Sequence, residues 1–66
     1  MMKGTIDKKM EKGYGFILPE GGGKGIFFHS NSLVDVAFDD LREGDAVVFD
    51  TEDSEKGKNA INVKRA

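Results

Sequence analysis

Turn signals, most of them glycine, divide the chain into short apolar stretches and leave little room for a helix. Three turn segments stand out, at residues 21–23, 43–45 and 56–58. β-branched and aromatic residues dominate the stretches between and beside them, as strands prefer. Five short strands are therefore predicted, at residues 5–6, 14–18, 26–29, 46–51 and 60–63.

Five short strands with glycine turns predict a small all-β barrel or sandwich. Pro19 ends the second strand, because proline cannot donate to a central ladder. A barrel would also remove the exposed sheet edges that a chain of 66 residues could hardly cover otherwise. Single helical turns are expected at residues 30–33 and 39–43.

The length of the chain allows one domain, spanning residues 1–66. A domain of this size buries only about 60% of its unfolded surface, so its core is small. The sequence has no cysteine and a single histidine, His29, so we expect neither disulfides, nor a metal site, nor a cofactor. No apolar run approaches the roughly 18 residues of a membrane span, and the first residues lack the pattern of a signal peptide. A cytoplasmic protein is expected.

Charge is distributed unevenly along the chain. The net charge is −2, which argues mildly against a nucleic-acid-binding protein. Residues 1–30 carry five lysines against three acids, residues 31–55 carry nine acids against Arg42, and residues 56–66 carry four basic residues and no acid. Such asymmetry can leave one face neutral to basic while another face is acidic.

Strand alternation assigns one face of each strand to the core. Tyr14 and Phe16 share a face that is opposite to Ile17. Burying the two rings would expose Ile17, so the rings are predicted outside. The predicted core consists of Ile6, Ile17, Ile26, Phe28, Val47, Phe49, Ile61 and Val63.

The same choice puts Tyr14, Phe16 and Phe27 on the outer face, next to His29. An exposed cluster of large aromatic side chains usually marks a binding site. Aromatic rings stack on nucleobases, and each contact contributes roughly 1–3 kcal/mol. Lys12 precedes the first ring, where it could reach a phosphate. The cluster therefore indicates a site for single-stranded nucleic acid.

Two motifs resemble those of cold-shock domains. Residues 12–17, Lys-Gly-Tyr-Gly-Phe-Ile, are similar to the first ribonucleoprotein motif of that family, normally Lys-Gly-Phe-Gly-Phe-Ile. Residues 25–30, Gly-Ile-Phe-Phe-His-Ser, resemble the second motif, normally Val-Phe-Val-His-Phe-Ser after an acid. A glycine-rich hairpin separates the two, as in the family, and the resemblance covers nearly the whole chain.

This resemblance implies a five-stranded antiparallel barrel of the oligonucleotide-binding (OB) type. Family members bind single-stranded RNA and DNA with weak sequence preference and act as RNA chaperones. By position, the residues expected to contact nucleic acid are Lys12, Tyr14, Phe16, Phe27, His29 and Phe38.

The chain departs from the family pattern beside both motifs. The first strand of the family usually carries Lys-Trp-Phe, whereas residues 7–10 here are Asp-Lys-Lys-Met. The phenylalanine that normally follows the histidine is Ser30, and the acid before the second motif is Gly25. Lys8 or Lys9 is expected to replace stacking with phosphate contact. Binding is therefore predicted to be weaker and more salt-sensitive than in a typical member.

The main hypothesis is a monomeric, non-enzymatic protein that binds single-stranded RNA or DNA. A rival is a protein-interaction module in which the aromatic patch receives a peptide and the acidic residues 35–55 steer a basic partner. An enzyme is disfavoured, because His29 and Ser30 would point to opposite faces of a strand and no other dyad or deep pocket is visible. For Phe38 two interpretations stay open: it plugs one end of the barrel, or it adds a fourth ring to the patch.

Overall fold

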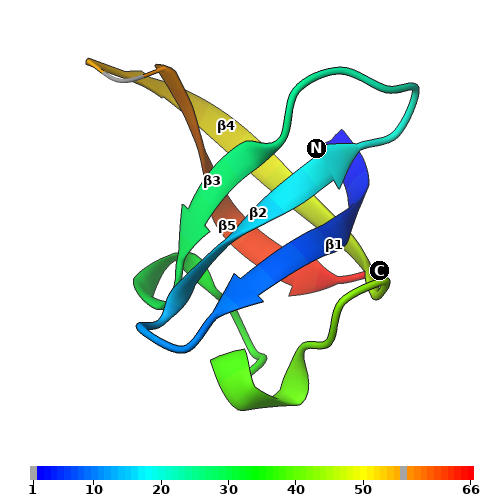
Figure 1. Cartoon of the computed structure of the whole chain (residues 1–66), viewed down its shortest axis with the longest axis vertical. Helices are drawn as coiled ribbons and strands as arrows, with labels where there is room; N and C mark the ends of the chain where they lie inside the picture. Colours follow the sequence, from blue (N-terminus) through cyan, green and yellow to red (C-terminus); the bar gives the residue numbers. More distant parts are fainter. Residues whose placement is uncertain (1, 56) are drawn as a thin grey trace.

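The computed structural model describes residues 2–55 and 57–66, and these form a closed barrel of five strands (Figure 1). Two single-turn 3-10 helices lie between the third and fourth strands. The elements are β1 (Met2–Met10), β2 (Tyr14–Pro19), β3 (Ile26–His29), η1 (Ser30–Ser32), η2 (Phe38–Asp40), β4 (Ala46–Ser54) and β5 (Gly57–Arg65). The all-β prediction is confirmed, and both helical turns occur at or beside their predicted positions. No helix in the described part of the chain is long and apolar enough to cross a membrane.

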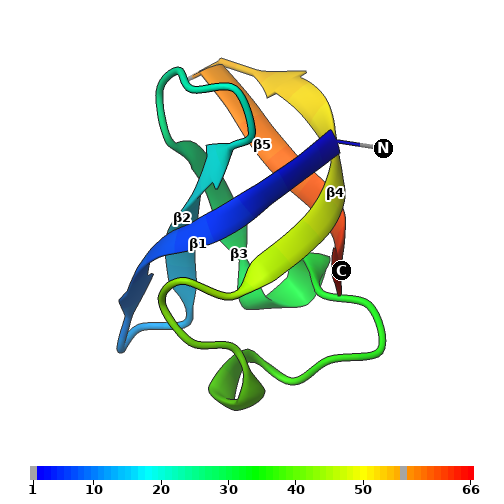
Figure 2. The ribbon, with the colours of Figure 1, turned by 90° about the vertical axis from the view of Figure 1, so that its right-hand side faces the viewer.

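The strands follow the order β1-β2-β3-β5-β4 around the barrel. Four of the seams are antiparallel, and the fifth, between β3 and β5, is parallel and pairs Phe27 with Asn59. Closure removes the free sheet edges, as expected for so short a chain. The long connection that carries η1 and η2 runs across one end of the barrel (Figure 2).

Apolar side chains from all five strands meet inside the barrel. Leu41, which follows η2, is fully buried with them and was not predicted. Leu33, Val36 and Phe38 of the long connection pack against this core from outside. The buried residues are Ile6, Ile17, Ile26, Phe28, Leu41, Val47, Phe49, Ala60 and Val63.

The prediction that Ile61 belongs to the core is wrong. Ile61 is half-buried, whereas Ala60 and Val63 are buried. The register between β4 and β5 shifts in this stretch, so that β5 contains one extra residue. Asn62, inside the shifted stretch, has a φ of 51°. A bulge of this kind interrupts the alternation of faces, and Ala60 takes the inward position that Ile61 would otherwise hold.

A second irregularity, in β1, decides where the first-strand lysines point. Ile6 pairs with Ile17 while Lys8 pairs with Phe16, so two residues of β1 oppose one residue of β2. After this shift Lys8 lies on the outer face, in line with Phe16. Lys9, the next residue, therefore faces the opposite way.

Gly15 lies where the barrel has no room for a side chain. A Cβ there would be 2.3 Å from the carbonyl oxygen of Lys8 and 2.9 Å from the Phe28 ring. Gly15→Ala should therefore lower the free energy of unfolding by about 1–3 kcal/mol, as overpacking does. Gly25→Ala is the matched control, because a Cβ at Gly25 would have its nearest contacts at 3.6 Å or more.

The control should change stability by less than about 0.5 kcal/mol. Urea unfolding of both variants and the parent protein measures the difference. Equal stabilities for the two alanine variants would contradict this account of the packing.

Candidate nucleic-acid interface

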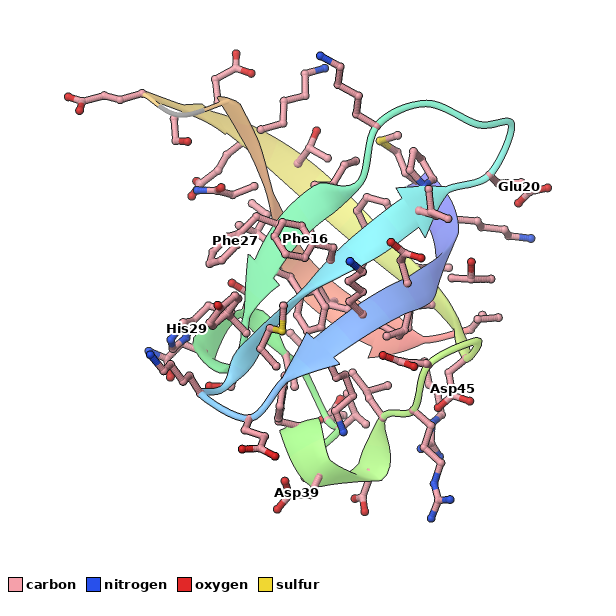
Figure 3. The ribbon with its side chains drawn as sticks, in the orientation of Figure 1. Phe16, Glu20, Phe27, His29, Asp39 and Asp45 are labelled. Carbon is pink, nitrogen blue, oxygen red and sulfur yellow. The ribbon has the colours of Figure 1, made fainter. Side chains whose placement is uncertain are left out.

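Three aromatic rings lie together on the outer face of β2 and β3. The cross-strand register sets Phe16 opposite Phe27 and Tyr14 opposite His29. The ring centroids are 6.4 Å apart for Tyr14 and Phe16, 5.6 Å for Tyr14 and Phe27, and 6.0 Å for Phe16 and Phe27. All three rings are half-buried. We call Tyr14, Phe16 and Phe27 the aromatic platform; Figure 3 shows two of its rings beside each other, with His29 farther along.

The platform rings support one another's orientation. Phe16 meets Tyr14 at an interplanar angle of 81° and Phe27 at 75°, while Tyr14 and Phe27 are inclined by 30°. Edge-to-face and tilted contacts at these separations are the arrangements that aromatic quadrupoles favour. The rings are thus held in place by the protein itself, with part of each ring reaching solvent.

His29 ends β3 beside the platform and is exposed. Its Nδ1 accepts a hydrogen bond of 3.1 Å from the backbone N–H of Asn31. His29 is thereby the N-cap residue of η1. The Ser30 hydroxyl lies 3.5 Å from the same nitrogen. A neutral imidazole whose Nδ1 accepts carries its proton on Nε2, so the free end of the ring is a hydrogen-bond donor. No pattern in the sequence predicted that His29 would cap η1 through the backbone of Asn31.

Basic and amide side chains extend the platform across neighbouring strands. Lys8 is exposed and pairs with Phe16, and on the other side Phe27 pairs with Asn59. One cross-strand row therefore runs through β1, β2, β3 and β5. Lys12 is exposed in the turn between β1 and β2, just before the first platform ring. Asn59 was not among the predicted residues, because only the parallel seam brings it here.

Lys9 and Phe38 lie together at the end of the barrel. The Lys9 ammonium donates to the carbonyl of Leu41 and lies 4.7 Å from the centre of the Phe38 ring. Phe38 in turn packs on the core, with its ring centroid 6.1 Å from that of Phe28. These contacts tie the long connection to β1. They favour the interpretation of Phe38 as a plug, and they direct Lys9 away from the row that Lys8 occupies.

Comparison with known proteins identifies the family. The model of the 'Cold-shock' DNA-binding domain matches residues 2–66. The major cold shock protein of Micrococcus luteus is 44% identical over 55 residues, which make up 83% of this chain and 82% of that protein. Cold shock protein ScoF of Streptomyces coelicolor is 39% identical over 67 residues and is aligned over the full length of both chains.

A solved structure extends the likeness to three dimensions. Drosophila Unr CSD456 superimposes with a TM-score of 0.83 and 28% sequence identity, over 98% of this chain and 26% of that one. The sequence match and the structural match thus cover the same, nearly complete length. This chain belongs to the cold-shock domain family, whose members bind single-stranded nucleic acids and are not enzymes.

Proposed function

We propose that the protein is an RNA chaperone that binds single-stranded RNA or DNA by stacking bases on the aromatic platform. The observation that carries the proposal is the contact among Tyr14, Phe16 and Phe27 on the outer face, flanked by Lys8 and His29. Each stacked base contributes roughly 1–3 kcal/mol. Because every base has a π-face, such a surface accepts many sequences.

Each predicted residue has its own part in this proposal. Lys8 on β1, beside Phe16, and Lys12 in the turn before β2 are both exposed and neutralise phosphates. His29 donates from Nε2 to an acceptor on a base or phosphate. Lys9 does not contact the nucleic acid, because its ammonium is engaged with the Leu41 carbonyl and the Phe38 ring. Phe38 then contributes by keeping the long connection closed on the barrel.

The chaperone activity follows from preferential binding. A protein that binds unpaired bases and cannot bind them inside a duplex shifts the equilibrium of a hairpin toward its open form. The shift needs no nucleoside triphosphate, because binding energy alone drives it. The proposal retains the expectation of a monomer acting in the cytoplasm.

Removing one platform ring should weaken binding without unfolding the barrel. Phe27→Ala should lower the affinity for a labelled oligothymidine by about 5- to 150-fold, which corresponds to one lost stacking contact. Phe27→Tyr keeps the ring and should bind within a few-fold of the parent protein. Fluorescence anisotropy measures the affinity, and urea unfolding verifies that each variant is folded.

Unchanged affinity in a folded Phe27→Ala variant would contradict stacking on the platform. Absence of any oligothymidine binding by the parent protein, combined with binding of a basic peptide, would instead favour the protein-interaction module. Quenching of Tyr14, the one tyrosine in a chain without tryptophan, gives a second readout of strand binding.

The two neighbouring lysines of β1 should behave differently under salt. For single strands the slope of log affinity against log salt concentration changes by about 0.7 for each phosphate that is neutralised. Lys8→Met should therefore flatten the slope by about 0.7, while Lys9→Met should leave the slope unchanged. Lys9→Met should lower stability instead, by about 1 kcal/mol, because it removes a charged hydrogen bond and a cation–π contact.

Salt titrations between low and moderate ionic strength, with urea unfolding alongside, measure both effects. A salt-independent affinity of the parent protein would argue against phosphate contacts altogether. If Lys9→Met flattened the slope as much as Lys8→Met does, the assignment of Lys9 to the barrel end would be refuted.

A further inference from the structure

The aromatic platform opens at one side into a groove. Phe16, Phe27 and Asn59, which belong to one cross-strand row, also line this groove. Its walls are the connection between β2 and β3 and the hairpin of β4 and β5. Figure 1 shows that both segments extend beyond the same end of the barrel. The groove is thus continuous with the platform.

Backbone topology creates this groove. β3 and β5 are paired at one position, between Phe27 and Asn59, so the parallel seam is short. Beyond that position β4 and β5 continue as a two-stranded ribbon as far as the pairing of Ser54 with Gly57. On the other side, the chain from Gly21 to Gly23 turns through three glycines with positive φ. The two walls diverge because no backbone pairing joins their described residues there.

Among the described residues, the lining combines apolar surface with two lysines. Lys24 comes from the β2–β3 connection and Lys58 from β5, and both are exposed. One carboxylate, that of Glu55, also lines the groove, and Asp53 lies opposite Lys58 in the strand register. The apolar part is formed by Met2, Phe16, Pro19, Ile26 and Phe27.

Position 25 bears on the charge of the groove lining. The second motif of the family normally follows an acid, and here that position is Gly25, directly after Lys24. Gly25 and Lys24 both line the groove, and Gly25 carries no carboxylate beside the lysine. A carboxylate at this position would repel an anion, so glycine here favours a phosphate beside Lys24.

We propose that the groove binds the continuation of the single strand beyond Phe27, with Lys24 and Lys58 contacting its phosphates. The inference rests on the function proposed above and extends its site. A polyanion whose bases already lie on the platform must leave across one of its sides, and this side offers apolar surface and two ammonium groups. With a volume of about 1120 Å³ the groove exceeds the usual size of a single small-ligand pocket, roughly 300–1,000 Å³. The groove is therefore large enough for a segment of the nucleic-acid strand.

The proposal makes the effect of the two lysines depend on strand length. A trinucleotide provides as many bases as the platform has rings and leaves the groove empty. An octanucleotide reaches beyond the platform. Neutralising the lysines should therefore weaken the longer ligand selectively.

The experiment compares Lys24→Met/Lys58→Met with Lys3→Met/Lys64→Met as the matched control. Lys3 and Lys64 are exposed, both pair with Val48 of β4, and neither lines the groove. Each double variant loses two positive charges. Binding of oligothymidines with three and eight nucleotides is followed by chemical-shift titration at several salt concentrations.

For the octanucleotide, Lys24→Met/Lys58→Met should flatten the salt slope by about 1.4, as expected for two phosphates. The trinucleotide slope should be unchanged by this variant, and the control should alter neither slope. Glu55→Gln should strengthen octanucleotide binding, because it removes the carboxylate that lines the groove.

Three results would overturn the inference. If the octanucleotide binds the groove variant with the parent slope, the strand does not enter the groove, although the proposed function stands. Equal effects of the groove and control variants would mean that the lysines act through overall charge alone. If the parent protein bound neither oligothymidine, the proposed function itself would fail along with this extension.

Discussion

Inward packing of Ile17, Ile26 and Phe28 determines where the platform rings can lie. These three side chains are 0%, 9% and 0% exposed, and burial of each contributes about 1.5–3 kcal/mol. Neighbouring residues of a strand point to opposite faces, so the same packing turns Phe16 and Phe27 outward. A register slip of one residue would exchange the two faces and forfeit the core. The surface that we propose for binding is thus a direct consequence of how the barrel is filled.

Gly15 affects both the inward and the outward face of β2. It occupies the inward position between Tyr14 and Phe16, where the Phe28 ring comes close to the backbone. A side chain there would push β2 away from Phe28 and disturb the spacing of the rings on the other face. The second glycine of the first motif therefore makes room for the core, while its aromatic neighbours form the proposed binding surface.

The bulge in β1 determines where two lysines that are adjacent in sequence point. It aligns Lys8 with the platform row, and it directs Lys9 to the Leu41 carbonyl and the Phe38 ring. One lysine can then meet a phosphate while the other holds the long connection. The first strand thus anchors the barrel end through Lys9, and in the proposed function it supplies charge to the site through Lys8.

Alternation and turn chemistry were enough to predict where the five strands lie, most of the core and the outward rings, because these depend on local pattern. The predicted strands at 5–6, 46–51 and 60–63 were shorter than β1, β4 and β5. Non-local features were beyond that reasoning. Ile61 was misassigned because a bulge around Asn62 shifts the register. The burial of Leu41 and the groove beside Phe27 depend on packing between segments that are far apart in the sequence, which no local pattern contains.

The most direct test of the account is a chemical-shift titration of the protein with a short oligothymidine, observing ring and backbone signals together. We expect the largest shifts at Tyr14, Phe16, Phe27 and His29, with ring protons moving upfield as bases stack on them, and small shifts for the buried Ile17 and Phe28. Shifts confined to the acidic residues 35–55, or spread evenly over the barrel, would contradict the central claim that the outward rings form the binding surface.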